Sequence, residues 1–103
     1  MIKVTVFYPA GEDKTFNMDY YLNTHMALVA KLSGAALKGI SVDSGLSGDM
    51  PGTPAPYVAI GHLFFNSMED FGQYFVPNIN EIVADVPNYT NIQPVVQINQ
   101  VMM

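Results

Sequence analysis

The sequence predicts a small α+β domain built as strand–helix–strand twice over. Short runs of β-branched and aromatic residues alternate with two longer segments whose apolar residues recur at helical spacing. With 103 residues the chain has the length of one domain. Half of the residues are hydrophobic and only 13% are charged. The chain can therefore bury a core without disulfide bonds, and its low charge favours a partner that covers apolar surface.

The first half of the chain predicts two strands that flank one helix. Residues 2–8 (IKVTVFY) form the first strand because β-branched and aromatic side chains dominate them. A charged turn over residues 9–15 follows. The helix begins after Asn17, a residue type favoured at the N-cap, and Gly34 ends it. The second strand is predicted over residues 37–46.

The second half repeats this order after a loop. Residues 47–56 are rich in glycine and proline, so we expect a mobile lid that borders the pocket. Residues 57–65 form a strand that is apolar on both faces. The second helix starts after Ser67 with a capping-box pattern and is interrupted at Pro77. The last strand is predicted over residues 92–102.

The order βαββαβ predicts how these elements are arranged in space. Right-handed crossovers give a four-stranded antiparallel sheet with both helices on one face, which is the ferredoxin-like plan. The other face of the sheet is then bare, and we expect it to be largely apolar. Packing two such faces together would bury that surface, so the sequence predicts a homodimer that forms a barrel with a closed interior.

The charge and composition exclude several classes of function. The net charge is −5 and the chain has no arginine, which argues against binding to nucleic acid or to an anionic membrane. No cysteine is present, so disulfides and thiolate chemistry are excluded. No signal segment precedes the first strand, and no apolar run approaches the ~18 residues of a membrane span. We expect a cytoplasmic protein.

His25 is the most informative residue for function. The residues that share the apolar face of the first helix are Met18, Tyr21, Leu22, His25, Leu28, Val29 and Leu32. One interpretation of His25 is a core histidine whose ring nitrogens are satisfied. The other is an acid/base or ligand-anchoring group at a pocket wall, with Tyr21 supplying a phenol one turn earlier.

Further candidates lie on other elements. His62 faces the same side of its strand as three apolar residues, so it is either a pocket residue or a structural one. Asp85, Asn88 and Tyr89 could contact a ligand or form an ordinary helix end and turn. Tyr8 is expected beside His25. The sequence has no ligand spacing typical of a metal site and no cofactor-binding motif, so neither a metal nor a cofactor is expected.

Two segments resemble a known family. Residues 16–29 (FNMDYYLNTHMALV) resemble the Y-Y-x-x-H-M-P-L signature of the EthD family, and residues 87–94 (PNYTNIQP) resemble its second signature. Residues 6–9 (VFYP) also fit. The resemblance covers essentially residues 1–103 as a single EthD-like domain. It implies a ferredoxin-like fold that pairs into a dimeric α/β barrel. Ala27 stands where the family usually has proline, so we expect a more regular helix here.

The resemblance also implies a range of functions. EthD-like proteins are named for ethyl tert-butyl ether degradation beside an oxygenase system, and the domain is often labelled an oxidoreductase. The wider superfamily includes lactone isomerases, polyketide cyclases, dehydratases and cofactor-free monooxygenases. One hypothesis is therefore a cofactor-independent catabolic enzyme, of isomerase, lyase or monooxygenase type, that acts on a small apolar oxygenated compound. In it, His25 is the acid/base and Tyr21 a hydrogen-bond donor.

The alternative hypothesis is a protein without catalytic activity. Such a protein would bind a hydrophobic metabolite or accompany an oxygenase system. Under either hypothesis the partners are a second copy of the chain and a small apolar or aromatic molecule. The residues expected to contact that molecule are Tyr8, His62, Asp85, Asn88 and Tyr89.

Overall fold

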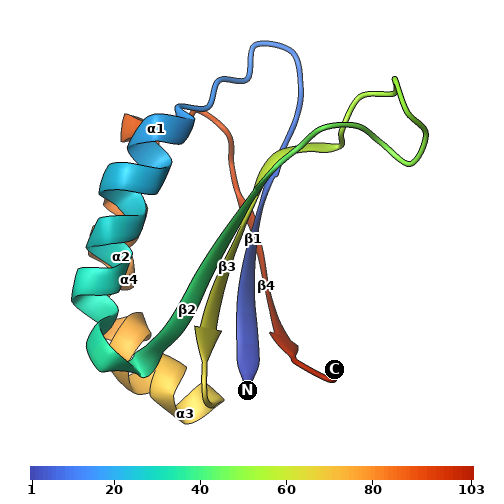
Figure 1. Cartoon of the computed structure of the whole chain (residues 1–103). Helices are drawn as coiled ribbons and strands as arrows, with labels where there is room; N and C mark the ends of the chain where they lie inside the picture. The colour runs from blue at the N-terminus through green and yellow to red at the C-terminus, as the bar shows by residue number, and fades with distance from the viewer.

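The computed structural model describes all residues from 1 to 103. Its four strands are β1 (Ile2–Pro9), β2 (Leu37–Ser44), β3 (Tyr57–Phe65) and β4 (Val95–Gln100). They form one sheet in the order β2-β3-β1-β4, and every neighbouring pair is antiparallel. The helical segments lie together on one side of this sheet (Figure 1). The predicted ferredoxin-like α+β fold is therefore confirmed.

Each half contributes a helical region made of several consecutive segments. The first contains α1 (Met18–Tyr20), the π turn η1 (Tyr21–His25), α2 (Met26–Ser33) and the 3₁₀ turn η2 (Gly34–Ala36). The second contains α3 (Met68–Asp70), the π turn η3 (Phe71–Phe75), the 3₁₀ turn η4 (Val76–Asn78), α4 (Ile79–Ala84) and the 3₁₀ turn η5 (Val86–Asn88). No helix is both long and apolar enough to cross a lipid bilayer.

The predicted helix starts and the first helix stop are confirmed. The Asn17 side chain accepts a hydrogen bond from the backbone N–H of Tyr20 at 3.0 Å. The Ser67 hydroxyl accepts one from the N–H of Asp70 at 3.1 Å. Both bonds satisfy helix N–H groups that have no partner within the helix. Gly34 has a φ of 60° at the end of α2, a value that favours glycine.

The first helical region is less regular than the sequence predicts. The Met26 N–H bonds to the carbonyl of Tyr21, five residues back instead of the four of an α-helix. This wider turn brings Met26 into the core and rotates Leu22 outward, where it is 46% exposed. The expectation that Leu22 faces the core is therefore wrong. Ala27 lies in the regular α2, so the irregular turn precedes it.

The second helical region contains the same irregularity at the same distance from its N-cap. The Val76 N–H bonds to the carbonyl of Phe71 across the π turn Phe71–Phe75. In each π turn the first and last rings are buried and stacked, at 14° for Tyr21–His25 and at 18° for Phe71–Phe75. The two halves are therefore a structural repeat, although the sequence shows no repeat there.

The bare face of the sheet is less apolar than the sequence predicts. On β3 the buried residues alternate with half-buried ones that face away from the helices. An in-register row of polar residues crosses all four strands on this bare face: Gln97, Thr5, His62 and Ser41. The next row carries Val95, Phe7, Ile60 and Asp43. The expectation of a largely apolar bare face was wrong because β3 is the only strand that is apolar on both of its faces.

The loop between β2 and β3 projects beyond the sheet, away from the helices (Figure 1). Leu46 at its start is 96% exposed. None of the loop residues lines the cavity described below, so the expectation that this loop borders the pocket is wrong. β4 also starts later than predicted, directly after Pro94, which has no N–H to donate to a neighbouring strand.

Candidate functional site

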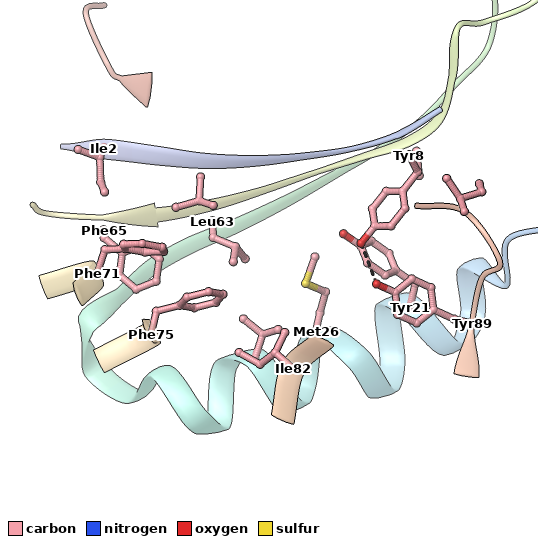
Figure 2. Close-up of a cluster of buried hydrophobic side chains, with 14 residues drawn as sticks. Ile2, Tyr8, Tyr21, Met26, Leu63, Phe65, Phe71, Phe75, Ile82 and Tyr89 are labelled. Carbon is pink, nitrogen blue, oxygen red and sulfur yellow. Dashed lines mark hydrogen bonds between the residues drawn. The ribbon is translucent and has the colours of Figure 1, made fainter. Parts of the chain in front are cut away.

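A cavity of about 130 Å³ lies between the helices and the sheet. Its walls come from β1, β3, β4 and both helical regions, and 15 of the 17 lining residues are hydrophobic. Phe71 and Phe75 lie at one end of this core and the tyrosines at the other (Figure 2). Val83 and Val96 line the cavity but are 58% and 57% exposed, so the cavity opens between α4 and β4.

His25 lines the cavity and is paired with a carboxylate. Its Nδ1 lies 2.9 Å from Oδ2 of Asp85. The His25 side chain is 5% exposed and that of Asp85 is 13% exposed. Asp85 does not line the cavity, so the Nδ1 edge of the ring faces away from it. The opposite nitrogen, Nε2, lies on the side of Tyr89, which does line the cavity.

Two further side chains hold Asp85 in place. The Tyr20 hydroxyl donates to its Oδ1 at 2.6 Å, and Nδ2 of Asn88 donates to the same oxygen at 2.9 Å. Burial alone would raise the pKa of Asp85, but the hydrogen bonds from Tyr20, Asn88 and His25 hold it below its ordinary value. Asp85 is therefore ionised near neutral pH, and both of its oxygens are already used.

Three tyrosine hydroxyls gather at the polar end of the cavity. Those of Tyr8 and Tyr89 are 2.7 Å apart (Figure 2). The Tyr89 hydroxyl also lies 3.5 Å from Nε2 of His25. The Tyr21 hydroxyl is buried and has no hydrogen-bond partner. It fits there because Gly61, on β3, has no Cβ to occupy the same space. Burial raises the pKa of all three phenols, so they stay protonated and can donate.

The protonation state of His25 follows from these contacts. Burial lowers the pKa of His25 below its ordinary value of 6.5, and the nearby Asp85 opposes this shift only in part. His25 is therefore neutral at pH 7. A carboxylate can only accept, so the single ring proton lies on Nδ1 and points at Asp85. Nε2 then carries a lone pair that can accept a long hydrogen bond from the Tyr89 hydroxyl, 3.5 Å away.

The structure brings together six of the seven residues that the sequence singled out. Four of them line the cavity: Tyr8, Tyr21, His25 and Tyr89. Asp85 and Asn88 lie behind His25. His62 does not join them, because it points to the bare face of the sheet. There its Nε2 lies 2.9 Å from Oδ2 of Asp43, and its Nδ1 lies 3.3 Å from the hydroxyl of Thr5.

Two residues of this site escaped the sequence analysis. Tyr20 is not among the residues of the predicted apolar helix face, yet its hydroxyl donates a hydrogen bond to Asp85. Gly61 reads as an ordinary strand residue, and only its contact with the Tyr21 hydroxyl reveals its role. A glycine inside an apolar strand is a weak signal of close approach by another group. No group of three or more His, Cys, Asp or Glu side chains could hold a metal ion.

The fold and the cavity define a class: a ferredoxin-like α+β protein with an apolar cavity between its helices and its sheet. The model of the EthD domain matches residues 10–93, and the chain belongs to the EthD family. A crystal structure of an EthD-like protein from Ralstonia eutropha JMP134 is 37% identical, with a TM-score of 0.92 over 99% of this chain and 92% of that one. The resemblance inferred from the sequence is confirmed.

More distant structures share the fold. An ethyl tert-butyl ether degradation (EthD) family protein from Bacillus halodurans C-125 is 18% identical, with a TM-score of 0.73 over 99% of both chains. A dimeric protein of unknown function and ferredoxin-like fold from Bacteroides fragilis is 14% identical. Its TM-score is 0.56 over 97% of this chain and 95% of that one. No curated protein matches the sequence.

The stability of the protein should fall on mild acidification because of His25. Its pKa is lower in the folded chain than in the unfolded chain, so the unfolded state binds the proton more readily. The stabilising effect of neutral His25 is therefore complete above about pH 6.5 and is lost as the pH falls through the lower, folded pKa. The pKa of Asp85 is lowered in the folded chain, so protonation of its carboxylate should remove further stability at pH values below about 3.8, the ordinary pKa of this group.

Urea denaturation of the wild type and of His25→Gln at pH 8, 6 and 5 measures this effect. The difference in unfolding free energy between the two proteins should shrink as the pH falls from 8 to 5. If Asp85 instead dominated and raised the pKa of His25, the difference would grow over the same range.

Proposed function

We propose that this EthD-family chain is a catabolic enzyme in which His25 performs acid/base chemistry on a small apolar oxygenated compound. The compound would occupy the cavity, and no bound cofactor would be needed. The observation that carries the proposal is the His25–Asp85 pair at the polar end of that cavity. A neutral imidazole can accept a proton on the lone pair of Nε2, and Asp85 would then stabilise the imidazolium. The Tyr21 hydroxyl, which has no other partner, would donate to the oxygen of the compound.

The structural repeat argues against a purely structural role for His25. Phe75 occupies the equivalent position in the second half and stacks on Phe71 as His25 stacks on Tyr21. An apolar ring is therefore sufficient to pack such a position. A buried imidazole and carboxylate instead carry a desolvation cost. Their presence at the cavity supports a chemical role.

A second candidate function is binding without turnover, as for a carrier of a hydrophobic metabolite or an accessory protein of an oxygenase system. The apolar character of 15 of the 17 lining residues favours this alternative. Native purification followed by mass spectrometry of any retained small molecule separates the two functions. Conversion of that molecule by fresh wild-type protein, but not by His25→Gln, supports the enzyme. Recovery of the molecule unchanged from the wild type supports the carrier.

We also propose that the chain forms a homodimer through the bare sheet face, as the Bacteroides fragilis protein is described as dimeric. The half-buried side chains of Phe7 and Ile60 supply apolar surface for this contact. Light scattering at micromolar concentration should give twice the chain mass of 11.3 kDa. Ile60→Lys should reduce the mass to one chain, whereas Leu22→Lys, at a helix residue that is 46% exposed, should not. A monomeric wild type would contradict this proposal.

A further inference from the structure

The Tyr21 hydroxyl is a hydrogen-bond donor without an acceptor in the chain. Tyr21 is fully buried and lines the cavity, and its hydroxyl has no hydrogen-bond partner. The hydroxyls of Tyr8 and Tyr89, in contrast, bond to each other. A buried donor without an acceptor is unfavourable. We therefore expect the ligand to place an acceptor atom against the Tyr21 hydroxyl.

A base adjoins the same end of the cavity. Nε2 of His25 carries a lone pair, and the hydrogen bond that it accepts from the Tyr89 hydroxyl is long, at 3.5 Å. A bond of that length is weak, so a ligand atom can displace it. The rings of His25 and Tyr21 are stacked with their centroids 5.6 Å apart. One small molecule can therefore contact the lone pair and the Tyr21 hydroxyl together.

The cavity also limits the size of this molecule. An engineered apolar cavity of roughly 150 Å³ holds benzene, so the cavity of about 130 Å³ admits a molecule no larger than one small ring. Hydrophobic residues supply 15 of the 17 that line it, which favours a ligand that is apolar apart from its acceptor group.

We infer that the ligand is a small carbonyl compound whose α-hydrogen is removed by His25 while Tyr21 donates a hydrogen bond to the carbonyl oxygen. This inference rests on the proposed function and narrows its substrate from oxygenated compounds in general to carbonyl compounds. A base can remove a hydrogen next to a carbonyl group because the electron pair left on carbon is delocalised onto the oxygen. An ether oxygen accepts the same hydrogen bond but cannot take up that pair.

The charges that form in this step are stabilised by groups already in place. The C–H bond breaks, its proton goes to Nε2 of His25, and its electron pair forms an enolate whose oxygen is negative. Burial raises the pKa of Tyr21, so the phenol keeps its proton and stabilises that oxygen by a hydrogen bond. Asp85, 2.9 Å from Nδ1, stabilises the imidazolium. The imidazolium then returns the proton to carbon.

Cyclopent-3-enone tests the inference because it is one small ring with a carbonyl group and α-hydrogens. At pH 8, where His25 is neutral, the wild type should convert it to cyclopent-2-enone, since the proton leaves the α-carbon and returns to the far carbon of the double bond. In deuterated buffer, NMR follows this isomerisation and the entry of deuterium together. Tyr21→Phe should lower the rate by about 10²–10³-fold, as for the loss of one donor to an oxyanion, and His25→Gln by about 10²–10⁴-fold.

Tyr74→Phe is the matched control, because it removes the hydroxyl of a tyrosine that is 45% exposed and does not line the cavity. Its rate should equal that of the wild type. Tyr21→Phe should keep its melting temperature, since the lost hydroxyl had no partner.

Two results would overturn the inference: a wild type that does not accelerate the isomerisation, or a Tyr21→Phe protein that isomerises at the wild-type rate. His25-dependent conversion of the molecule retained on purification would leave the proposed function in place in either case. Failure of that conversion as well would overturn both.

Discussion

Replacing His25 by glutamine should abolish most of the turnover while leaving the fold and ligand binding intact. Glutamine is similar in size and keeps hydrogen-bonding capacity toward Asp85 and Tyr89. It cannot take up a proton near neutral pH, so the general acid/base contribution is lost. That contribution is typically worth about 10²–10⁴-fold in rate. The measurement is kcat for the compound identified by mass spectrometry, together with its dissociation constant.

His62→Gln provides the matched control for this experiment. It makes the same chemical change in the only other histidine of the chain, which lies on the bare face beside Thr5 and Asp43. Turnover per folded molecule should stay at the wild-type level in His62→Gln. If His25→Gln instead lowers the melting temperature and keeps its turnover per folded molecule, then His25 is a structural residue.

Adding one methyl group at Gly61 should destabilise the protein strongly. The Cβ of an alanine there would overlap the Tyr21 hydroxyl and would lie 3.2 Å from Cε of Met26. The methionine can move, but the phenol is fully buried. Overpacking of this kind costs about 1–3 kcal/mol. For a domain of this length, each kcal/mol corresponds to about 4–8 °C in melting temperature, which calorimetry would measure.

Two companion variants isolate the cause of that loss. Tyr21→Phe removes only the hydroxyl, and the nearest ring atom is then 3.4 Å from the new Cβ, an ordinary contact. The double variant Gly61→Ala/Tyr21→Phe should therefore recover most of the lost stability. Gly72→Ala adds the same methyl group where no atom lies within 4 Å, and it should not destabilise the protein. A double variant as unstable as Gly61→Ala alone would show that Tyr21 is not the obstacle.

The strands and the helix starts could be predicted because they depend on local signals. Side chains alternate along each strand, and Asn17 and Ser67 provide caps that do not require knowledge of the rest of the chain. The π turns could not be predicted in this way. Helical projection assumes a constant 3.6 residues per turn, and the π turn at Tyr21 breaks that period, which is why Leu22 was misplaced.

The members of the site could be named from the sequence, but their arrangement could not. His25 and Tyr21 were conspicuous on a helical face, whereas Asp85 lies sixty positions from His25 and gave no sign of pairing with it. Only the packing of the second helical region against the first brings Asp85 to Nδ1. His62 shows a different difficulty. The alternation of side chains along β3 assigns His62 to one face of the strand, but it does not show which of the two faces borders the cavity.

The repeated π turns also make this fold a scaffold for redesign. Residues 25 and 75 line the same cavity from equivalent backbone positions. The backbone at either position can therefore present a functional side chain to that cavity. A titratable or metal-binding group introduced at position 75 would line the same cavity as the natural imidazole. The second half of the fold could therefore acquire chemistry of its own while the first half keeps His25.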